Sequence, residues 1–333
     1  MRLYISGIVS VLLVLGFPFI MNEVVDSFRK CHQFFLNEMP PMIPGILENS
    51  TSTNETYILI CQKYMSNYTF ATLYDTANRI PVFSAYEYTG VGERRPGERW
   101  KIERQLEPSG ADMKVPFVHQ ASNRDYCSSD TKNKQVDRGH LFPSSHANNN
   151  NTKKSTFTLT NAVPQKKSFN SGSWCDMENK VRDLMNKHCR HKEDNNRTSA
   201  YVLTGAVPGT DTMNDRVNIP SYMWTAFCCY NRNSWVSQAH WAENVDEKNV
   251  PGSSRDERHA KGGKKNKKNN QIGIPSISLE QLHQILSTFW PNIQLFANCT
   301  NILNESSLLG INTEHDYGQD ESCKEMDAKQ CSE

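Results

Sequence analysis

Ten cysteines are spread over this chain of 333 residues, from position 31 to position 331. A length of this order can bury a substantial core and suggests one large domain or two ordinary ones. An even, dispersed set of cysteines predicts disulfide bonds if the chain matures in an oxidising compartment. The sequence therefore predicts a disulfide-bonded fold, but it leaves open which cysteines are joined.

The N-terminal segment favours an oxidising compartment. Arg2 precedes an almost wholly apolar run from Leu3 to Ile20, and acidic residues follow it. This order is typical of a secretory signal peptide, so we expect residues 1–22 to be removed and the protein to be secreted and extracellular. No stable membrane association is then expected. An uncleaved membrane anchor stays as the alternative, because the run has a borderline length and no A-x-A cleavage site is visible.

Glycosylation sequons support the same compartment. The chain contains seven N-x-S/T sequons, which start at Asn49, Asn54, Asn67, Asn150, Asn196, Asn298 and Asn304. Each is a weak signal alone, but together with a signal peptide they predict a glycoprotein whose marked loops lie at the surface.

The hydrophobic pattern predicts both strands and helices. Strands are expected where β-branched and aromatic residues concentrate, at 71–74, 81–88, 157–160, 201–204, 222–230 and 235–241. One helix is expected where apolar residues recur at helical spacing between Trp174 and His188. A second is expected after Ser278, which forms a capping box with Gln281.

We expect one main domain and three further segments. Residues 23–60 are predicted to be an N-terminal extension, residues 61–304 the main domain, and residues 305–333 a polar tail. A basic segment at 253–271 interrupts the domain, with seven Lys or Arg residues against two acidic ones. It is either a solvated insertion or an arm that attracts phosphate. Since the whole chain has a net charge of only +1, a polyanion would have to be bound by a local patch of this kind.

The stretch 135–179 carries the strongest chemical signal. His140 is a side chain whose charge changes near neutral pH, so it can act as a general base on water. Arg138 can bind phosphate through its planar fork. The carboxamide of Asn170 is a hard oxygen ligand suited to Mg²⁺, and Glu178 can hold a metal-bound water. These groups are the parts needed to hydrolyse a phosphodiester.

The order of the motifs resembles that of the DNA/RNA non-specific endonucleases, which are ββα-metal nucleases and include endonuclease G. The segments "DRGHL", "TFTLTNAVPQ" and "FNSGSW", with a glutamate four residues further on, match that family's signature in order and spacing. The resemblance extends over about residues 72–290. The stretch "ATLYDTANRIPVFSAYEY" is most similar to the secreted endonuclease domain-containing 1 group.

The resemblance implies a fold and a reaction. It implies an α+β fold with a central, mostly antiparallel sheet flanked by helices, and a ββα-metal (His-Me) finger as the active site. The expected activity is a metal-dependent, non-specific endonuclease (a phosphodiesterase) acting on DNA or RNA. His140 is implied to be the general base, Asn170 the ligand of Mg²⁺ (or of Mn²⁺ in its place), and Glu178 the residue that holds a metal-bound water.

Three further residues receive roles from the same resemblance. Asn161 is implied to orient the site, and Arg138 and Arg99 to contact phosphate or to stabilise the transition state. The chain departs from the family pattern at Phe142, where a small residue is usual. The sequon at Asn150 lies between the two halves of the motif, and a glycan there would restrict a bulky substrate.

Three alternatives remain open from the sequence. Cys175, His188, Cys189 and His191 could form a zinc site, although their spacing matches no common zinc motif. The chain could also be a secreted binding protein that keeps the fold without cleaving nucleic acid, or a structural glycoprotein. The joint presence of His140, Asn170 and Glu178 favours an enzyme, because a binding scaffold has no need of the base.

Overall fold

A computed structural model describes residues 23–92, 96–97, 99–108, 114–249, 273–297, 299 and 301–303. The predicted signal peptide, the basic segment 253–271 and the polar tail from residue 305 lie outside these residues. The predicted domain boundaries therefore stay predictions.

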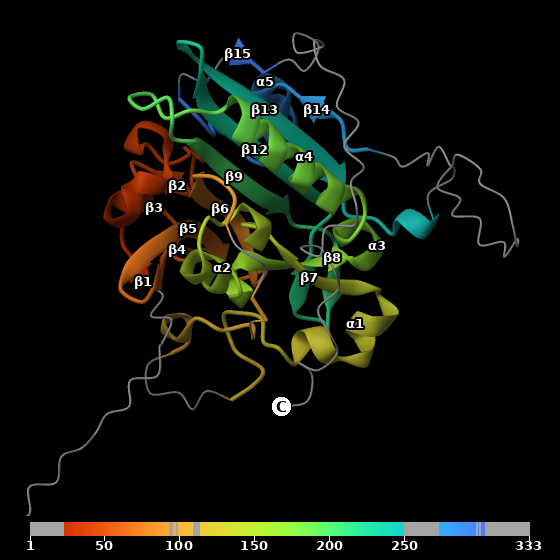
Figure 1. The fold of residues 1–333 in the computed structure, drawn as a ribbon. Helices are drawn as coiled ribbons and strands as arrows, with labels where there is room; N and C mark the ends of the chain where they lie inside the picture. Colours follow the sequence, from red (N-terminus) through yellow and green to blue (C-terminus); the bar gives the residue numbers. More distant parts are fainter. Residues whose placement is uncertain are drawn as a thin grey trace, which may run out of the picture.

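A large antiparallel sheet forms the centre of the molecule (Figure 1). Within the described residues it has nine strands in the order β1-β4-β5-β6-β9-β12-β13-β14, and β15 pairs with β13. The strands are β1 Glu23–Val25, β4 Tyr57–Tyr64, β5 Asn67–Asp75, β6 Ile80–Tyr88, β9 Ala200–Val207, β12 Tyr222–Asn231, β13 Ser234–Glu243, β14 Ser276–Ile277 and β15 Asn301–Ile302. Only the β13–β15 pair among them is parallel.

Three strand pairs stand apart from this sheet in the described part of the chain. They are β2 Leu47–Glu48 with β3 Thr51–Ser52, β7 Val136–His140 with β8 Ala162–Lys166, and β10 Asp211–Met213 with β11 Val217–Ile219. All three pairs are antiparallel.

The helices are short, with one exception. The α-helices are α1 Ser129–Asn133, α2 Asn150–Ser155, α3 Lys167–Asn170, α4 Ser173–His188 and α5 Leu279–Leu286. The 3₁₀ helices are η1 Phe28–Phe34, η2 Leu36–Glu38, η3 Arg104–Leu106, η4 Asp125–Cys127, η5 Ser144–His146, η6 Leu159–Asn161 and η7 Glu247–Asn249.

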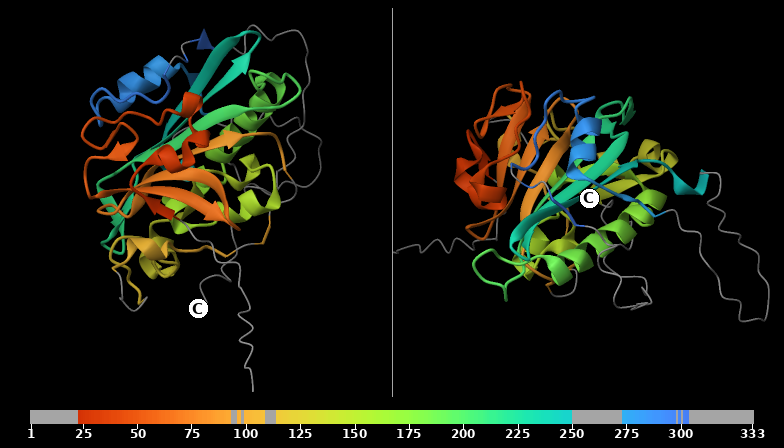
Figure 2. Two further views of the ribbon diagram at one scale, coloured as in Figure 1. Left: turned by 90° about the vertical axis from the view of Figure 1, so that its left-hand side faces the viewer. Right: turned by 90° about the horizontal axis from the view of Figure 1, so that it is seen from above.

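Both faces of the sheet are covered, because side chains of its central strands are buried on both sides. On one face Met223 and Phe227 of β12 belong to the same apolar cluster as Met177 and Val181 of α4. On the opposite face η1 and α5 cover Trp224, which is 1% exposed. Figure 2 shows these layers from two further directions. The predicted α+β class with a mostly antiparallel sheet is thus confirmed.

The local predictions succeed except at one strand. The helix expected between Trp174 and His188 is α4, and the capping box of Ser278 and Gln281 starts α5. The strand expected at 157–160 is wrong, because the chain turns there into η6. The N–H of Asn161 donates to the carbonyl of Thr158, and the strand β8 begins only at Ala162.

Disulfides join distant segments, as the cysteine count predicts. Cys31 is bonded to Cys61, Cys189 to Cys229, and Cys228 to Cys299. Cys127 and Cys175 are disulfide-bonded as well. The neighbouring Cys228 and Cys229 point to opposite faces of β12, as successive residues of a strand do, and so each anchors a different layer to the sheet.

The surface features agree with the sequon prediction. The asparagines of the five described sequons, Asn49, Asn54, Asn67, Asn150 and Asn196, are all exposed. In the described part of the chain, no helix combines the length and the apolar character needed to span a membrane.

Candidate active site

The hairpin of β7 and β8 carries the front half of the motif. His140, the last residue of β7, is paired with Ala162, and Gly139 is paired with Val163. A Cβ atom on Gly139 would lie 2.0 Å from Oε1 of Gln165, so only glycine lets this hairpin close. The glycine therefore serves the packing of the hairpin itself.

The imidazole of His140 lies between two aromatic rings. Its ring centroid is 4.5 Å from that of Trp100 and 4.9 Å from that of Phe157, which meets it edge-on. Trp100 and Phe157 are buried, whereas His140 is only half-buried. The two rings thus hold the orientation of the imidazole, whose Nε2 atom is buried. Arg99 is exposed and directly precedes Trp100.

Asn161 is completely buried and ties the segment after His140 to the sheet. Its Oδ1 accepts hydrogen bonds from the N–H of Phe142 at 2.9 Å and from the hydroxyl of Ser84 on β6 at 2.8 Å. Its Nδ2 donates to the carbonyls of Phe142 and Thr156. These four hydrogen bonds link the segment after His140 to β6 and to the chain before η6.

Phe142, the departure from the family pattern, points away from the site. It is 1% exposed, stacks on Tyr86 with the ring centroids 3.8 Å apart, and meets Phe70 edge-on. Its bulk therefore fills the core. The sequon residue Asn150 is exposed at the first position of α2.

The back half of the motif follows β8 directly. α3 begins one residue after β8, contacts both strands of the hairpin and ends at Asn170. Gly172 then allows a tight passage into α4, since a Cβ there would lie 2.2 Å from the carbonyl oxygen of Ser168. Asn170 is half-buried, and its carboxamide makes no hydrogen bond to the described residues.

Glu178 is held from two sides. The indole Nε1 of Trp174 donates to its Oε1 at 2.9 Å, one turn earlier on α4. Its backbone carbonyl lies 3.0 Å from Nε2 of His146. A carbonyl only accepts, so His146 carries its proton on Nε2 and its Nδ1 accepts from the hydroxyl of Tyr86. Burial lowers the pKa of His146 to about 4, so it stays neutral.

Arg138 lies on the same face of β7 as His140, two residues earlier. Its guanidinium sits 4.9 Å from the ring centroid of Tyr126, and its Nη2 donates to the carbonyl and to Oδ1 of Asn123. Burial lowers its pKa from the ordinary arginine value. The structure therefore places Arg138 beside the predicted base but largely inside the protein.

Two residues with a clear place near the site were not singled out from the sequence. Trp100 contacts His140, and His146 fixes the backbone of Glu178. The first could be suspected because Trp100 directly follows Arg99, for which the resemblance implies a role. Nothing in the sequence marks the second, because the contact joins residues 32 positions apart.

The donor set fits a hard cation that retains water. Asn170, the last residue of α3, offers a neutral amide oxygen. Glu178 offers a carboxylate from the next helix, α4. Among the described residues no group of three or more His, Cys, Asp or Glu side chains gathers to hold a metal. A site of one amide ligand and several waters is the type that Mg²⁺ accepts.

The structure excludes a zinc site at Cys175, His188, Cys189 and His191. Cys189 is bonded to Cys229 and Cys175 is also in a disulfide, so neither offers a thiolate.

A β-hairpin that ends in a histidine and leads into a helix bearing a carboxylate defines a ββα-metal type of site. A sequence profile of the DNA/RNA non-specific endonucleases matches residues 48–293. The chain therefore belongs to the DNA/RNA non-specific endonuclease family, whose substrate class is nucleic acid.

Two curated relatives carry the name endonuclease domain-containing 1 protein. The protein from Homo sapiens is 30% identical over 223 residues, which cover 63% of this chain and 41% of that protein. The protein from Mus musculus is 30% identical over 216 residues, covering 61% and 39%. The chain thus spans about two fifths of the length of these relatives.

Among solved structures, a chain of the crystal structure of the EndoG/EndoGI complex is similar to this one. It is 21% identical, with a TM-score of 0.40, over 54% of this chain and 73% of that chain.

Proposed function

We propose that this protein is a secreted, Mg²⁺-dependent endonuclease that hydrolyses DNA, and RNA as a second substrate, without sequence specificity. The observation that carries the proposal is the continuous unit β7-β8-α3-α4. It delivers His140, Asn170 and Glu178 from one hairpin and the helices that follow it.

In this proposal His140 takes the proton from the attacking water, because its imidazole ends β7 and is oriented by Trp100 and Phe157. Asn170 would hold the ion through its amide oxygen, and the carboxylate of Glu178 would accept hydrogen bonds from the water around it. A divalent ion, when bound, stabilises negative charge on the phosphate and on the leaving oxygen.

The two arginines have different roles in this proposal. Arg99 is exposed and contacts the phosphate of the substrate. Arg138 is held by Tyr126 and Asn123, so we assign it to fixing the face of β7 on which His140 lies. Asn161 orients the site from the core.

The test is cleavage of plasmid DNA by the disulfide-bonded protein with Mg²⁺ or Mn²⁺, with and without a chelator. We expect cleavage that the chelator abolishes and that His140→Ala and Asn170→Ala each lower by at least 100-fold. His32→Ala is the matched control, because His32 is half-exposed on η1 at the opposite face of the sheet. Equal activity of His140→Ala and wild type would reject the assigned base.

Complete lack of cleavage by the wild type with either metal would favour the binding-protein alternative. Retained binding of DNA by that inactive protein would then identify it as a nucleic-acid-binding glycoprotein on the same fold.

A further inference from the structure

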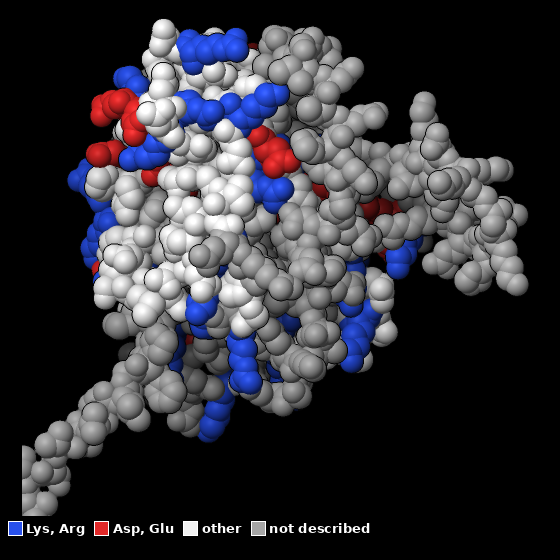
Figure 3. All heavy atoms as spheres, in the orientation of Figure 1, with Lys and Arg blue, Asp and Glu red and all other residues white. Residues whose placement is uncertain are grey.

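A basic cavity lies at the C-terminal end of α4, ten residues beyond Glu178. It has a volume of about 340 Å³ and is lined by Lys187, His188, Arg190, Arg232 and three asparagines. None of these lining residues, as the structure describes them, carries a carboxylate. Figure 3 shows Lys and Arg side chains gathered at this end of the molecule, alongside a few acidic ones. We call this cavity the basic pocket.

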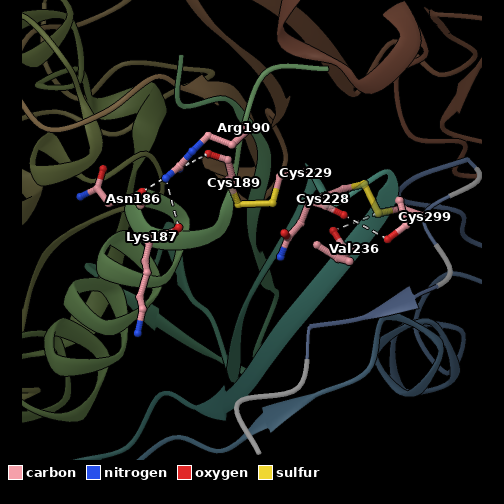
Figure 4. Close-up of a disulfide and its surroundings, with 10 residues drawn as sticks. Asn186, Lys187, Cys189, Arg190, Cys228, Cys229, Val236 and Cys299 are labelled. Atoms are coloured by element: carbon pink, nitrogen blue, oxygen red, sulfur yellow. Dashed lines mark hydrogen bonds between the residues drawn. A yellow bond between two sulfur atoms is a disulfide. The ribbon is translucent and has the colours of Figure 1, made fainter. Parts of the chain in front are cut away.

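The walls of the basic pocket are firmly joined. The disulfide Cys189–Cys229 links the end of α4 to β12, as Figure 4 shows. The next residue, Arg190, donates its N–H to the carbonyl of Tyr230 at 2.9 Å. The pocket is therefore fixed before any ligand arrives, because two adjacent covalent and hydrogen-bonded links hold its two sides together.

Arg190 is pinned in place and still has donors to offer. Its guanidinium donates to the carbonyls of Asn186, Lys187 and Cys189 at the end of α4 (Figure 4). An arginine has five side-chain N–H groups, and these contacts use three of them. Two are left over within the described part of the chain.

The positive charges of the basic pocket converge on His188. Its pKa is lowered by burial and then by the charges of Lys187, Arg232 and Arg190. Lys187, Arg190 and Arg232 form no ion pair with any described residue. The Nε2 atom of His188 is buried without a hydrogen-bond partner among those residues. Such an arrangement is unfavourable alone and becomes favourable when an anion enters.

Arg232 occupies a backbone position that does not favour arginine. With Asn233 it forms the two-residue turn between β12 and β13, and their φ angles are +45° and +67°. Turns of this type prefer glycine or asparagine at both central positions. The turn therefore does not account for the arginine, whereas a ligand of the basic pocket would.

We infer that the basic pocket binds a phosphate group of the nucleic-acid backbone, away from the bond that is cleaved. This inference rests on the proposed function. Glu178 and His188 are ten residues apart on α4, which corresponds to about 15 Å along the helix axis. That length matches about four to five base steps of a duplex at ~3.4 Å each. A polynucleotide can therefore reach both places, and a di- or trinucleotide cannot.

The direct test is an NMR titration of isotope-labelled histidine with inorganic phosphate and then with a 20-nucleotide DNA, without metal. The ring signals of His188 should move on both additions, and those of His32 should not. The variant Lys187→Gln/Arg232→Gly should lose the response. It should stay folded, because glycine suits the turn and Lys187 is exposed. No shift at His188 in the wild type would overturn the inference.

The kinetic test uses substrates of two lengths. For 20-nucleotide DNA we expect the KM of Lys187→Gln/Arg232→Gly to rise about tenfold, and the slope of log affinity against log salt to fall by about two. For a trinucleotide the KM should not change. The control Arg29→Gln/Lys30→Gln removes the same charge from exposed residues of η1 and should leave both values unchanged.

The outcomes separate the inference from the proposed function. Phosphate binding at His188 without any effect on DNA affinity would overturn the assignment to nucleic acid, and so would an equal rise in KM for both lengths. If the wild type cleaves nothing, the proposed function fails, while the NMR titration with DNA still decides the inference.

Discussion

The indole N–H of Trp174 donates to the carboxylate of Glu178 at 2.9 Å, across one turn of α4. Trp174 is 1% exposed and packs against Phe169 of α3, whereas Glu178 is half-buried. A buried ring on the apolar side of the helix thus fixes a carboxylate at the edge of the site. This contact gives a physical reason for the family signature, in which a tryptophan is followed by a glutamate four residues later.

The replacement Trp174→Phe should weaken metal binding without unfolding the protein. Phenylalanine keeps most of the packing but cannot donate to Glu178, so the carboxylate loses its fixed orientation. We expect the Mg²⁺ concentration for half-maximal cleavage to rise by about tenfold. Titration of activity with Mg²⁺ measures this concentration.

Trp224→Phe is the control for Trp174→Phe, because the buried Nε1 of Trp224 has no hydrogen-bond partner among the described residues. Equal behaviour of the two variants would contradict the role of the contact.

The replacement Asn161→Ala should affect both stability and catalysis. It removes four hydrogen bonds from a fully buried site and frees the segment that follows His140. We expect the free energy of unfolding to fall by about 2–4 kcal/mol and kcat to fall by about tenfold with little change in KM. Urea denaturation and steady-state kinetics provide the two values.

Ser84→Ala serves as the graded control for Asn161. It removes the hydroxyl that donates to Oδ1 of Asn161 and that also lies 3.1 Å from Oγ1 of Thr72, so the expected loss of stability is about 1–2 kcal/mol. If the serine variant lost as much activity as Asn161→Ala, the bonds to Phe142 would not be the important ones.

Glu103 should make the protein less stable as the pH rises from about 4.5 to about 7. Burial raises the pKa of this carboxyl, which is 2% exposed, to about 7. In that pH range the folded protein holds a proton that the unfolded chain has lost, so the free energy of unfolding falls with increasing pH. The expected cost above pH 7 is at most about 3 kcal/mol.

Comparison of Glu103→Gln with the wild type isolates this effect from other titrating groups. Glutamine keeps an oxygen to accept from the N–H of Gln105 but cannot ionise. The two proteins should be equally stable at pH 4.5, and the variant should be more stable at pH 8. Urea denaturation at both pH values decides, and a difference that does not change with pH would refute the expectation.

The disulfide Cys189–Cys229 should contribute about 4 kcal/mol to the free energy of unfolding. It closes a loop with a sequence separation of 40 residues, and the chain-entropy relation gives this value for such a loop. Replacing both cysteines by serine should lower the denaturation midpoint and leave cleavage of trinucleotides intact. Replacing Cys228 and Cys299, whose separation is 71, should cost slightly more. A smaller loss for that second pair would argue against the entropic explanation.

The sequence predicted much of the fold because the signals that mark it are local. The strands from 81 to 88 and from 222 to 230 were visible from β-branched and aromatic residues, and Ser278 with Gln281 marked a helix start. The strand expected at 157–160 failed for a tertiary reason. The buried carboxamide of Asn161 binds the backbone of Phe142 and Thr156, and this stabilises a turn where propensity favours a strand.

By itself, the sequence determined the order of the chemical groups. The resemblance of its motifs to those of a nuclease family singled out His140, Asn161, Asn170 and Glu178, which all lie within one stretch of about 40 residues. The sequence also predicted disulfides, because a count of cysteines needs no structure.

Only the tertiary structure decided the surroundings of these groups. It paired Cys189 with Cys229, buried Arg138 against Tyr126, and brought His146 to the backbone of Glu178. It also assembled the basic pocket from the end of α4 and the turn at Arg232. Each of these features depends on contacts between residues far apart in the chain. The energies of such contacts depend on packing and burial, and the contacts produce no periodic pattern in the sequence.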